Sequence, residues 1–247
     1  MAEPVTIIAV AGIFVLAGLV KGVTGMGLPT VAMGLLGGLI APPAAAALLV
    51  LPSLVTNLWQ LVAGPALGAI LRRLGGMMAG VVVGTFLGLP LLAGGDTQRT
   101  TAMLGAALAL YAAHALLARP LAAPARAEPW LSPLVGLATG VLTGATGVFV
   151  IPAVPWLQSL RLEREALIQA LGLSFTVSTL ALATGLWWHG AFAPGQWGLS
   201  ALAILPALLG MAAGQWLRQR ISPAAFRRGF LLCLLALGLE LASRPFR

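Results

Sequence analysis

Lys21 is the residue with the clearest chemical role in this sequence, because it is the only lysine among 247 residues and lies in an apolar region. A cation at membrane depth is costly unless it faces a cavity or meets an anion. Glycines at positions 22, 25 and 27 and a proline at position 29 follow it and interrupt the helix that the flanking residues favour. The pattern predicts a broken membrane helix that presents a positive charge to a small anion.

A second broken stretch, from Thr143 to Gly147, follows in the other half of the chain. A transporter's binding site is typically formed by two apolar segments, one in each half of the chain, that glycine or proline interrupts at corresponding positions. Free N–H groups at half-helix N-termini bind anions, glycines let the backbone come close, and threonine hydroxyls add donors. The predicted anion-binding residues of the two stretches are Lys21, Gly22, Thr24, Gly25, Gly27, Thr143, Gly144, Thr146 and Gly147.

Two helix faces supply further polar candidates. Ser53 and Asn57 are spaced i, i+4, and so are Ser174 and Ser178, so each pair lies on one face of a helix. The pairs occupy matching positions in the two halves, after each broken stretch, and are predicted to line the same anion site. Packing is the alternative for all these candidates, because small and polar residues join membrane helices and a lysine near a helix end can extend to the interface.

The overall composition predicts an all-α polytopic membrane protein with a single membrane domain. Hydrophobic residues make up 60% of the chain and charged residues 8%, against roughly 25% charged residues in soluble domains. No Asp or Glu falls in the middle of a predicted span, no histidine pair has metal-ligand spacing, and Cys233 is the one cysteine. These features predict that the protein is not an enzyme and uses neither a metal nor a cofactor.

Six apolar runs are long enough to cross a bilayer, which takes about 20 residues. Two further apolar regions, residues 5–40 and 131–157, are split by the broken stretches. Their pieces are predicted to reach only about 18–24 Å at ~1.5 Å per residue, so they are predicted to be half-helices or re-entrant hairpins. The six predicted spans are residues 43–61, 75–93, 101–117, 165–188, 197–216 and 226–242.

The arginines discriminate between two topologies. If both split regions cross the membrane once, the arginines divide almost evenly between its two sides. If both return to their own side, one side collects ten arginines and the other keeps Arg99, Arg244 and Arg247. The positive-inside rule favours the second arrangement, with both termini outside the cytoplasm of a protein integral to the plasma (bacterial inner) membrane. Because the arginines occupy short loops, they indicate how the protein is oriented in the lipid bilayer. They do not indicate a nucleic-acid partner.

The two halves show weak internal similarity. Gly18, Gly22, Thr24 and Gly25 each have an identical residue 122 positions later. Each half, residues 1–120 and 129–247, comprises one broken hairpin and three spans. An odd number of crossings inverts the second half relative to the first, and inverted repeats are common in transporters. Small-residue faces at positions 80, 84 and 88 and at 210 and 214 leave a homodimer open as an alternative to packing within one chain.

Taken together, these stretches resemble the TauE/SafE sulfite-exporter family of membrane permeases. The resemblance covers nearly the whole chain and lies in GLVKGVTGMGLPT, GLATGVLTGATGVFVIP and PALLGMAAGQWLRQRISPAAFRRGF. It implies a secondary transporter that moves sulfur-containing anions, such as sulfite or a sulfonate. For this class we expect alternating access around an anion held between the two broken stretches. An anion channel and a non-transporting membrane assembly protein are the alternatives.

The two broken stretches differ in a way that affects anion binding. The second carries Thr143 where the first has Lys21, and Phe149 where the first has Gly27. The second stretch therefore has no cation and fewer glycines. We expect the two halves to contribute unequally to the anion site.

Overall fold

The structure is a computed structural model that describes residues 4–94, 96–117, 126–192 and 195–244. Every regular element in these residues is a helix, which confirms the predicted all-α fold. The helices are α1 (Pro4–Thr24), α2 (Leu28–Gly37), α3 (Pro42–Val62), α4 (Leu67–Ala93), α5 (Thr97–Leu117), α6 (Glu128–Thr146), α7 (Ala153–Ser159), α8 (Arg164–Trp188), α9 (Gln196–Leu202), α10 (Ile204–Arg218) and α11 (Pro223–Ser243).

Six segments of the described chain are long and apolar enough to cross a membrane, which confirms the multi-pass prediction. They are α1, α3, α4, α5, α8 and the stretch from α9 through α10. The set differs from the predicted one because α1 takes the place of α11. Helix α11 also has 21 residues, but it carries Arg227, Arg228 and Glu240.

The first split region is not a pair of half-helices, so that prediction is wrong for its first arm. Helix α1 has 21 residues and continues through Lys21 and Gly22 to Thr24. The chain turns only at Gly25 and Gly27, whose φ angles of 81° and 102° are left-handed and favour glycine. Helix α2, with 10 residues, is the short arm. A glycine within a helix is tolerated where another helix packs against it, and this moves the break beyond Lys21.

The second split region has the same form. Helix α6 has 19 residues and runs through Thr143 and Gly144 to Thr146. It ends at Gly147, and the short α7 has only seven residues. Two further boundaries differ from the prediction: α4 begins at Leu67 and not at residue 75, and the predicted span 197–216 is divided into α9 and α10 at Ala203.

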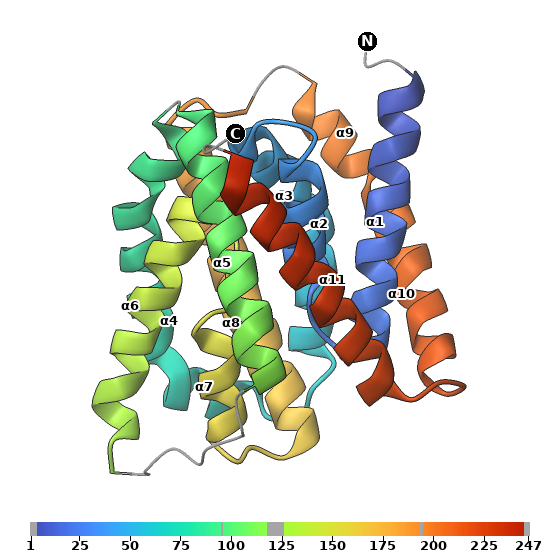
Figure 1. Cartoon of the computed structure of the whole chain (residues 1–247). Coiled ribbons are helices and arrows are strands. Elements are labelled where there is room, and N and C mark those ends of the chain that lie inside the picture. The colour runs from blue at the N-terminus through green and yellow to red at the C-terminus, as the bar shows by residue number, and fades with distance from the viewer. Residues whose placement is uncertain (1–3, 95, 118–125, 193–194, 245–247) are drawn as a thin grey trace.

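The long helices run in two opposite directions. In Figure 1, α1, α3 and α5 run from the upper end of the molecule to the lower end, whereas α6, α8 and α11 run upward. The start of α1 and the end of α11 therefore lie at the same end. Each long helix also packs against the other half: α1 on α10, α4 on α6 and α8, α3 on α8, and α5 on α11.

Glycines bring helix pairs into backbone-to-backbone contact, most closely α4–α6 and α1–α10. A Cβ atom added at Gly84 of α4 would lie 2.2 Å from the carbonyl oxygen of Leu137, and one at Gly140 of α6 would lie 2.2 Å from that of Val81. The α1–α10 pair is equally close, since a Cβ at Gly18 would lie 2.1 Å from the carbonyl oxygen of Ala207. Small residues permit such approach in membrane helices. The two halves are thus joined through glycine-lined seams, and α5–α11 is a further one through Gly105 and Gly238.

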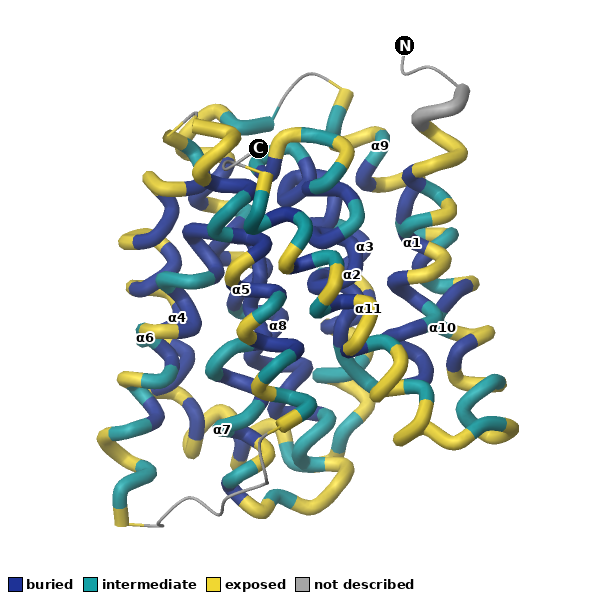
Figure 2. The backbone as a smooth tube through the Cα atoms, in the orientation of Figure 1, coloured by how far each residue is buried: buried dark blue, intermediate teal, exposed yellow. Residues whose placement is uncertain are grey.

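The small-residue faces considered for a homodimer are occupied within the chain. Gly80, Gly84 and Gly88 face α6, and Gly210 and Gly214 face α1. A homodimer would need another surface. Figure 2 shows buried and exposed positions alternating along α4 and α6, as expected for helices with one inward face. Many exposed side chains are large and apolar, including Leu87 and Leu110, and suit contact with lipid.

The described arginines lie mostly at one end of the molecule. That lower end holds the start of α4, the start of α6, the α7–α8 connection and the α10–α11 turn. These segments carry Arg72, Arg73, Arg126, Arg161, Arg164, Arg218, Arg220, Arg227 and Arg228. Arg99 and Arg244 lie at the upper end, and Arg119 and Arg247 lie outside the described residues. This distribution matches the hairpin topology, whereas the side of the membrane that each end faces remains a prediction.

Candidate functional site

Lys21 is buried at the centre of a polar network that joins three helices. Its side chain is 2% exposed. Its ammonium nitrogen Nζ donates to Thr56 Oγ1 at 3.0 Å and to Asn57 Oδ1, both on α3. Asn57 Nδ2 in turn donates to Thr179 Oγ1 on α8 at 3.5 Å. The predicted residues Lys21 and Asn57 are therefore brought into direct contact.

The local sequence explains the position of Lys21. It occupies the last turn of α1, where the partial negative charge of the helix end favours a cation. The turn that follows closes with a hydrogen bond of 2.7 Å from the Gly25 amide to the Lys21 carbonyl oxygen. Thr24 stabilises the same turn, since its hydroxyl lies 2.8 Å from the Val20 carbonyl oxygen and 2.7 Å from that of Met26. The Thr24 hydroxyl is thus engaged by the backbone.

The network extends deep into the molecule. Thr179 is well inside the 25-residue helix α8, about 22 Å from Arg164 at ~1.5 Å per residue. Lys21 lies nearer the lower end, in the last turn of α1, and lines the same pocket as Glu165 and Arg218.

Lys21 has no anionic partner among the described residues. The ion pairs found there are Arg73–Glu128, Arg99–Asp96 and Arg244–Glu240. Lys21 contacts only the neutral oxygens of Thr56 and Asn57. A buried charge is normally paired or coordinates a ligand. No described side chain therefore neutralises a charge on Lys21.

A pocket of about 160 Å³ connects Lys21 to the lower end of the molecule. Lys21, Gly25 and Gln60 form its inner wall, and it extends to Glu165 at the start of α8 and Arg218 at the end of α10. Glu165 is exposed and Arg218 is half-buried. The pocket therefore lies between Lys21 and the end that carries most of the arginines.

Three predicted serines add unpaired hydroxyls to α3 and α8. Ser53, Ser174 and Ser178 are fully buried, and their hydroxyl oxygens have no hydrogen-bond partner. Ser53 lies one turn from Asn57, and Ser178 is next to Thr179. A buried polar group without a partner costs about 1–3 kcal/mol. None of the three lines the pocket that Lys21 lines.

The second broken stretch contributes no free group of this kind. Thr143 Oγ1 donates to the Thr139 carbonyl oxygen and Thr146 Oγ1 to that of Leu142, each at 2.7 Å. Gly144 packs on α4, with an added Cβ 2.2 Å from the Thr85 carbonyl oxygen. Gly147 ends α6 with φ 71° and lies against Met33 of α2. The same packing explanation applies to Gly22, where a Cβ would lie 2.2 Å from the Met211 carbonyl oxygen.

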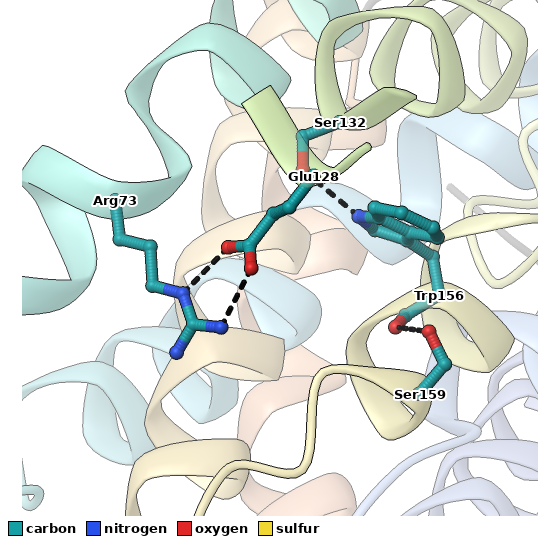
Figure 3. A network of polar contacts seen from close by, with 5 residues as sticks. All are labelled: Arg73, Glu128, Ser132, Trp156 and Ser159. Carbon is teal, nitrogen blue, oxygen red and sulfur yellow. Dashed lines mark hydrogen bonds and ion pairs between the residues drawn. The ribbon is translucent and has the colours of Figure 1, made fainter. Parts of the chain in front are cut away.

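A separate set of contacts holds the second hairpin at the lower end, as Figure 3 shows. Arg73 of α4 pairs with Glu128 of α6 through hydrogen bonds of 2.5 and 2.8 Å. Trp156 Nε1 on α7 donates to Ser132 Oγ on α6 at 3.0 Å. Ser159 Oγ donates to the Trp156 carbonyl oxygen at 2.6 Å. These contacts tie α4, α6 and α7 together away from Lys21.

Three site residues were not predicted from the sequence: Thr56, Gln60 and Thr179. Ser53, Thr56, Asn57 and Gln60 follow the i, i+3, i+4, i+7 spacing of one helix face. That polar stripe on an apolar helix is the signal that could have identified Thr56 and Gln60. Thr179 has no such signal, because its contact with Asn57 depends on how α3 meets α8.

Comparison with known protein families gives a match over most of the chain. The family model described as sulfite exporter TauE/SafE matches residues 10–241. No match was found among curated proteins or among solved structures. The family match includes both broken stretches and the α10–α11 region. The chain belongs to the TauE/SafE sulfite exporter family of membrane proteins.

Proposed function

We propose that the protein is a secondary transporter for small sulfur-containing anions, such as sulfite or an organosulfonate, and that Lys21 binds the anion. The observation that carries the proposal is a buried ammonium group whose partners are neutral oxygens of Thr56 and Asn57. A charge in this position is unfavourable unless an anion neutralises it. Membership of a sulfite exporter family makes a sulfur oxyanion the expected substrate.

The polar groups around Lys21 suit an oxyanion. An ammonium group has three N–H donors, and two of those of Lys21 are used by α3. The third remains for an anion oxygen. Sulfite and sulfonates have three oxygens, so the others can accept hydrogen bonds from the unpaired hydroxyls of Ser53, Ser174 and Ser178. In the proposed site, Lys21 supplies the charge and the serines supply neutral donors.

Alternating access by two inverted repeats is the proposed mechanism. Two observations support it. Corresponding helices run in opposite directions. The seams are also reciprocal, because α1 of the first half packs on α10 of the second, and α6 of the second half packs on α4 of the first. The pocket leads from Lys21 toward the lower end. Rocking of the halves would close this route and open one to the upper end. The proposed site lies between α1, α3 and α8, and the two hairpins contact each other where Gly147 meets Met33 of α2.

The proposed orientation places the lower end in the cytoplasm. Most described arginines lie at that end, and cytoplasmic loops carry an excess of arginine and lysine. Both ends of the chain would then lie outside the cytoplasm. In this orientation the pocket in the structure faces inward, and an exporter would load its substrate there.

Flux measurements with purified protein in proteoliposomes test the proposal. The test solutes are the anions sulfite, sulfoacetate, sulfate and chloride and the zwitterion taurine. Saturable flux of a sulfur oxyanion, stimulated by the same anion on the other side of the membrane, is the expected result. Conductance that does not saturate and shows no such counterflow would favour a channel. Absence of flux for every anion would favour the non-transporting alternative and contradict the proposal.

A further inference from the structure

The charges on the pocket wall restrict the anion that fits beside Lys21. Three ionisable side chains line the pocket: Lys21, Glu165 and Arg218. Glu165 and Arg218 have opposite charges and offset each other, so the wall carries one net positive charge. An anion with a single negative charge neutralises it. A dianion would leave one negative charge uncompensated in a mostly apolar surrounding, which is strongly unfavourable.

Gln60 adds a second restriction, because it offers an unused acceptor. Gln60 lies on α3, on the same face as Asn57, and lines the pocket with Lys21. Its amide nitrogen Nε2 donates to the Gly25 carbonyl oxygen at 2.7 Å, which fixes the orientation of the amide. Its carbonyl oxygen Oε1 is buried and has no hydrogen-bond partner. A buried acceptor without a donor is unfavourable, and a ligand O–H group would satisfy it.

We propose that Gln60 is a substrate-binding residue and that the pocket selects a monoanion carrying a hydrogen-bond donor over donor-free anions and dianions. The anion's oxygens bind Lys21, and its O–H group donates to Gln60 Oε1. Hydrogensulfite and hydroxysulfonates have both features. This inference rests on the proposed function, because it names the class of anion that the same site takes.

Three organosulfonates of nearly equal size separate the two restrictions. Isethionate is a monoanion with an O–H donor, 1-propanesulfonate is a monoanion without a donor, and sulfoacetate is a dianion without a donor. Their binding to the purified full chain is measured by isothermal titration calorimetry. We expect isethionate to bind about tenfold more tightly than 1-propanesulfonate, the difference that one unpaired buried acceptor makes. Sulfoacetate is expected to bind at least about tenfold more weakly than isethionate.

Two variants connect this selectivity to Gln60. Gln60→Met removes the acceptor at similar size, and isethionate should then bind no better than 1-propanesulfonate. Gln60→Lys keeps a donor for the Gly25 carbonyl oxygen and adds a cation, so sulfoacetate should become the tightest ligand. Gln219→Met, an exposed glutamine at the end of α10, is the control and should retain the wild-type order.

The outcomes distinguish this inference from the proposed function. Equal affinities of the wild-type protein for isethionate and 1-propanesulfonate, or a preference that survives in both Gln60 variants, would overturn the role of Gln60. Lys21-dependent binding of any of these anions would still support the proposed function. If neither sulfite nor any of the three shows binding that depends on Lys21, the proposed function and this inference both fail.

Discussion

Replacement of Gly84 by alanine tests whether the α4–α6 seam joins the two halves. The added Cβ would lie 2.2 Å from the carbonyl oxygen of Leu137 and 2.8 Å from the amide nitrogen of Val141, whereas real Cβ contacts essentially never fall below 3.0 Å. The helices must therefore separate by about 0.8 Å, and a gap of that size forfeits roughly a quarter to a half of each dispersion contact. Overpacking costs about 1–3 kcal/mol, and we expect the upper end of this range because neighbouring glycine contacts weaken as well.

Gly75→Ala is the matched control on the same helix. A Cβ at Gly75 has no atom within 4 Å, so alanine there should leave packing unchanged and raise helix stability by up to about 1 kcal/mol. The free energy of unfolding is measured for both variants by titration with a denaturing detergent. We expect opposite signs for the changes in unfolding free energy of the two variants. Wild-type stability in Gly84→Ala, or equal shifts in both variants, would refute the packing argument.

Three further predictions concern the network and the substrate. Asn57→Leu removes a charge-assisted hydrogen bond from Lys21, worth about 1.5–3 kcal/mol; the KM for sulfite flux should rise at least about tenfold, and an unchanged KM would exclude Asn57 from the site. Gln169→Leu removes three hydrogen bonds to the α3–α4 turn, so the free energy of unfolding in the detergent titration should fall by about 3 kcal/mol. A raised KM for sulfite without loss of stability would instead give Gln169 a binding role. As the pH is raised from about 6 to 9, hydrogensulfite loses its proton and becomes the sulfite dianion, so sulfite flux should fall relative to isethionate flux. A constant ratio of the two fluxes would contradict the selection of monoanions.

The general fold was predictable because it depends on composition and local pattern. A chain with few charges and long apolar runs can satisfy its backbone in lipid only as helices or a closed barrel, and the glycine and proline breaks locate the two short arms. The exact break was not predictable. Gly22 and Gly144 look like helix breakers in the sequence, but each faces the backbone of another helix, and that partner is known only from the fold.

The site was predictable in part for a similar reason. Lys21 and Asn57 stand out because a cation and an amide are rare and costly in apolar helices. Their direct contact, and the participation of Thr56 and Thr179, require α1, α3 and α8 to meet at one level. The matching threonines of the second stretch were expected to bind an anion, yet Thr143 and Thr146 donate to their own helix. Sequence alone cannot distinguish these two uses of a hydroxyl.

Sulfite flux by the Lys21→Met variant in proteoliposomes tests most directly whether Lys21 binds the transported anion. A cation about 4 Å from an anion at an effective dielectric of about 20 contributes roughly 4 kcal/mol, so kcat/KM should fall by about a thousandfold. Stability should stay the same or rise, because methionine removes a buried charge. Arg99→Met, at an arginine whose side chain is 85% exposed, is the matched control and should transport normally. A folded Lys21→Met protein with wild-type sulfite flux would contradict the assignment of Lys21 as the anion-binding residue.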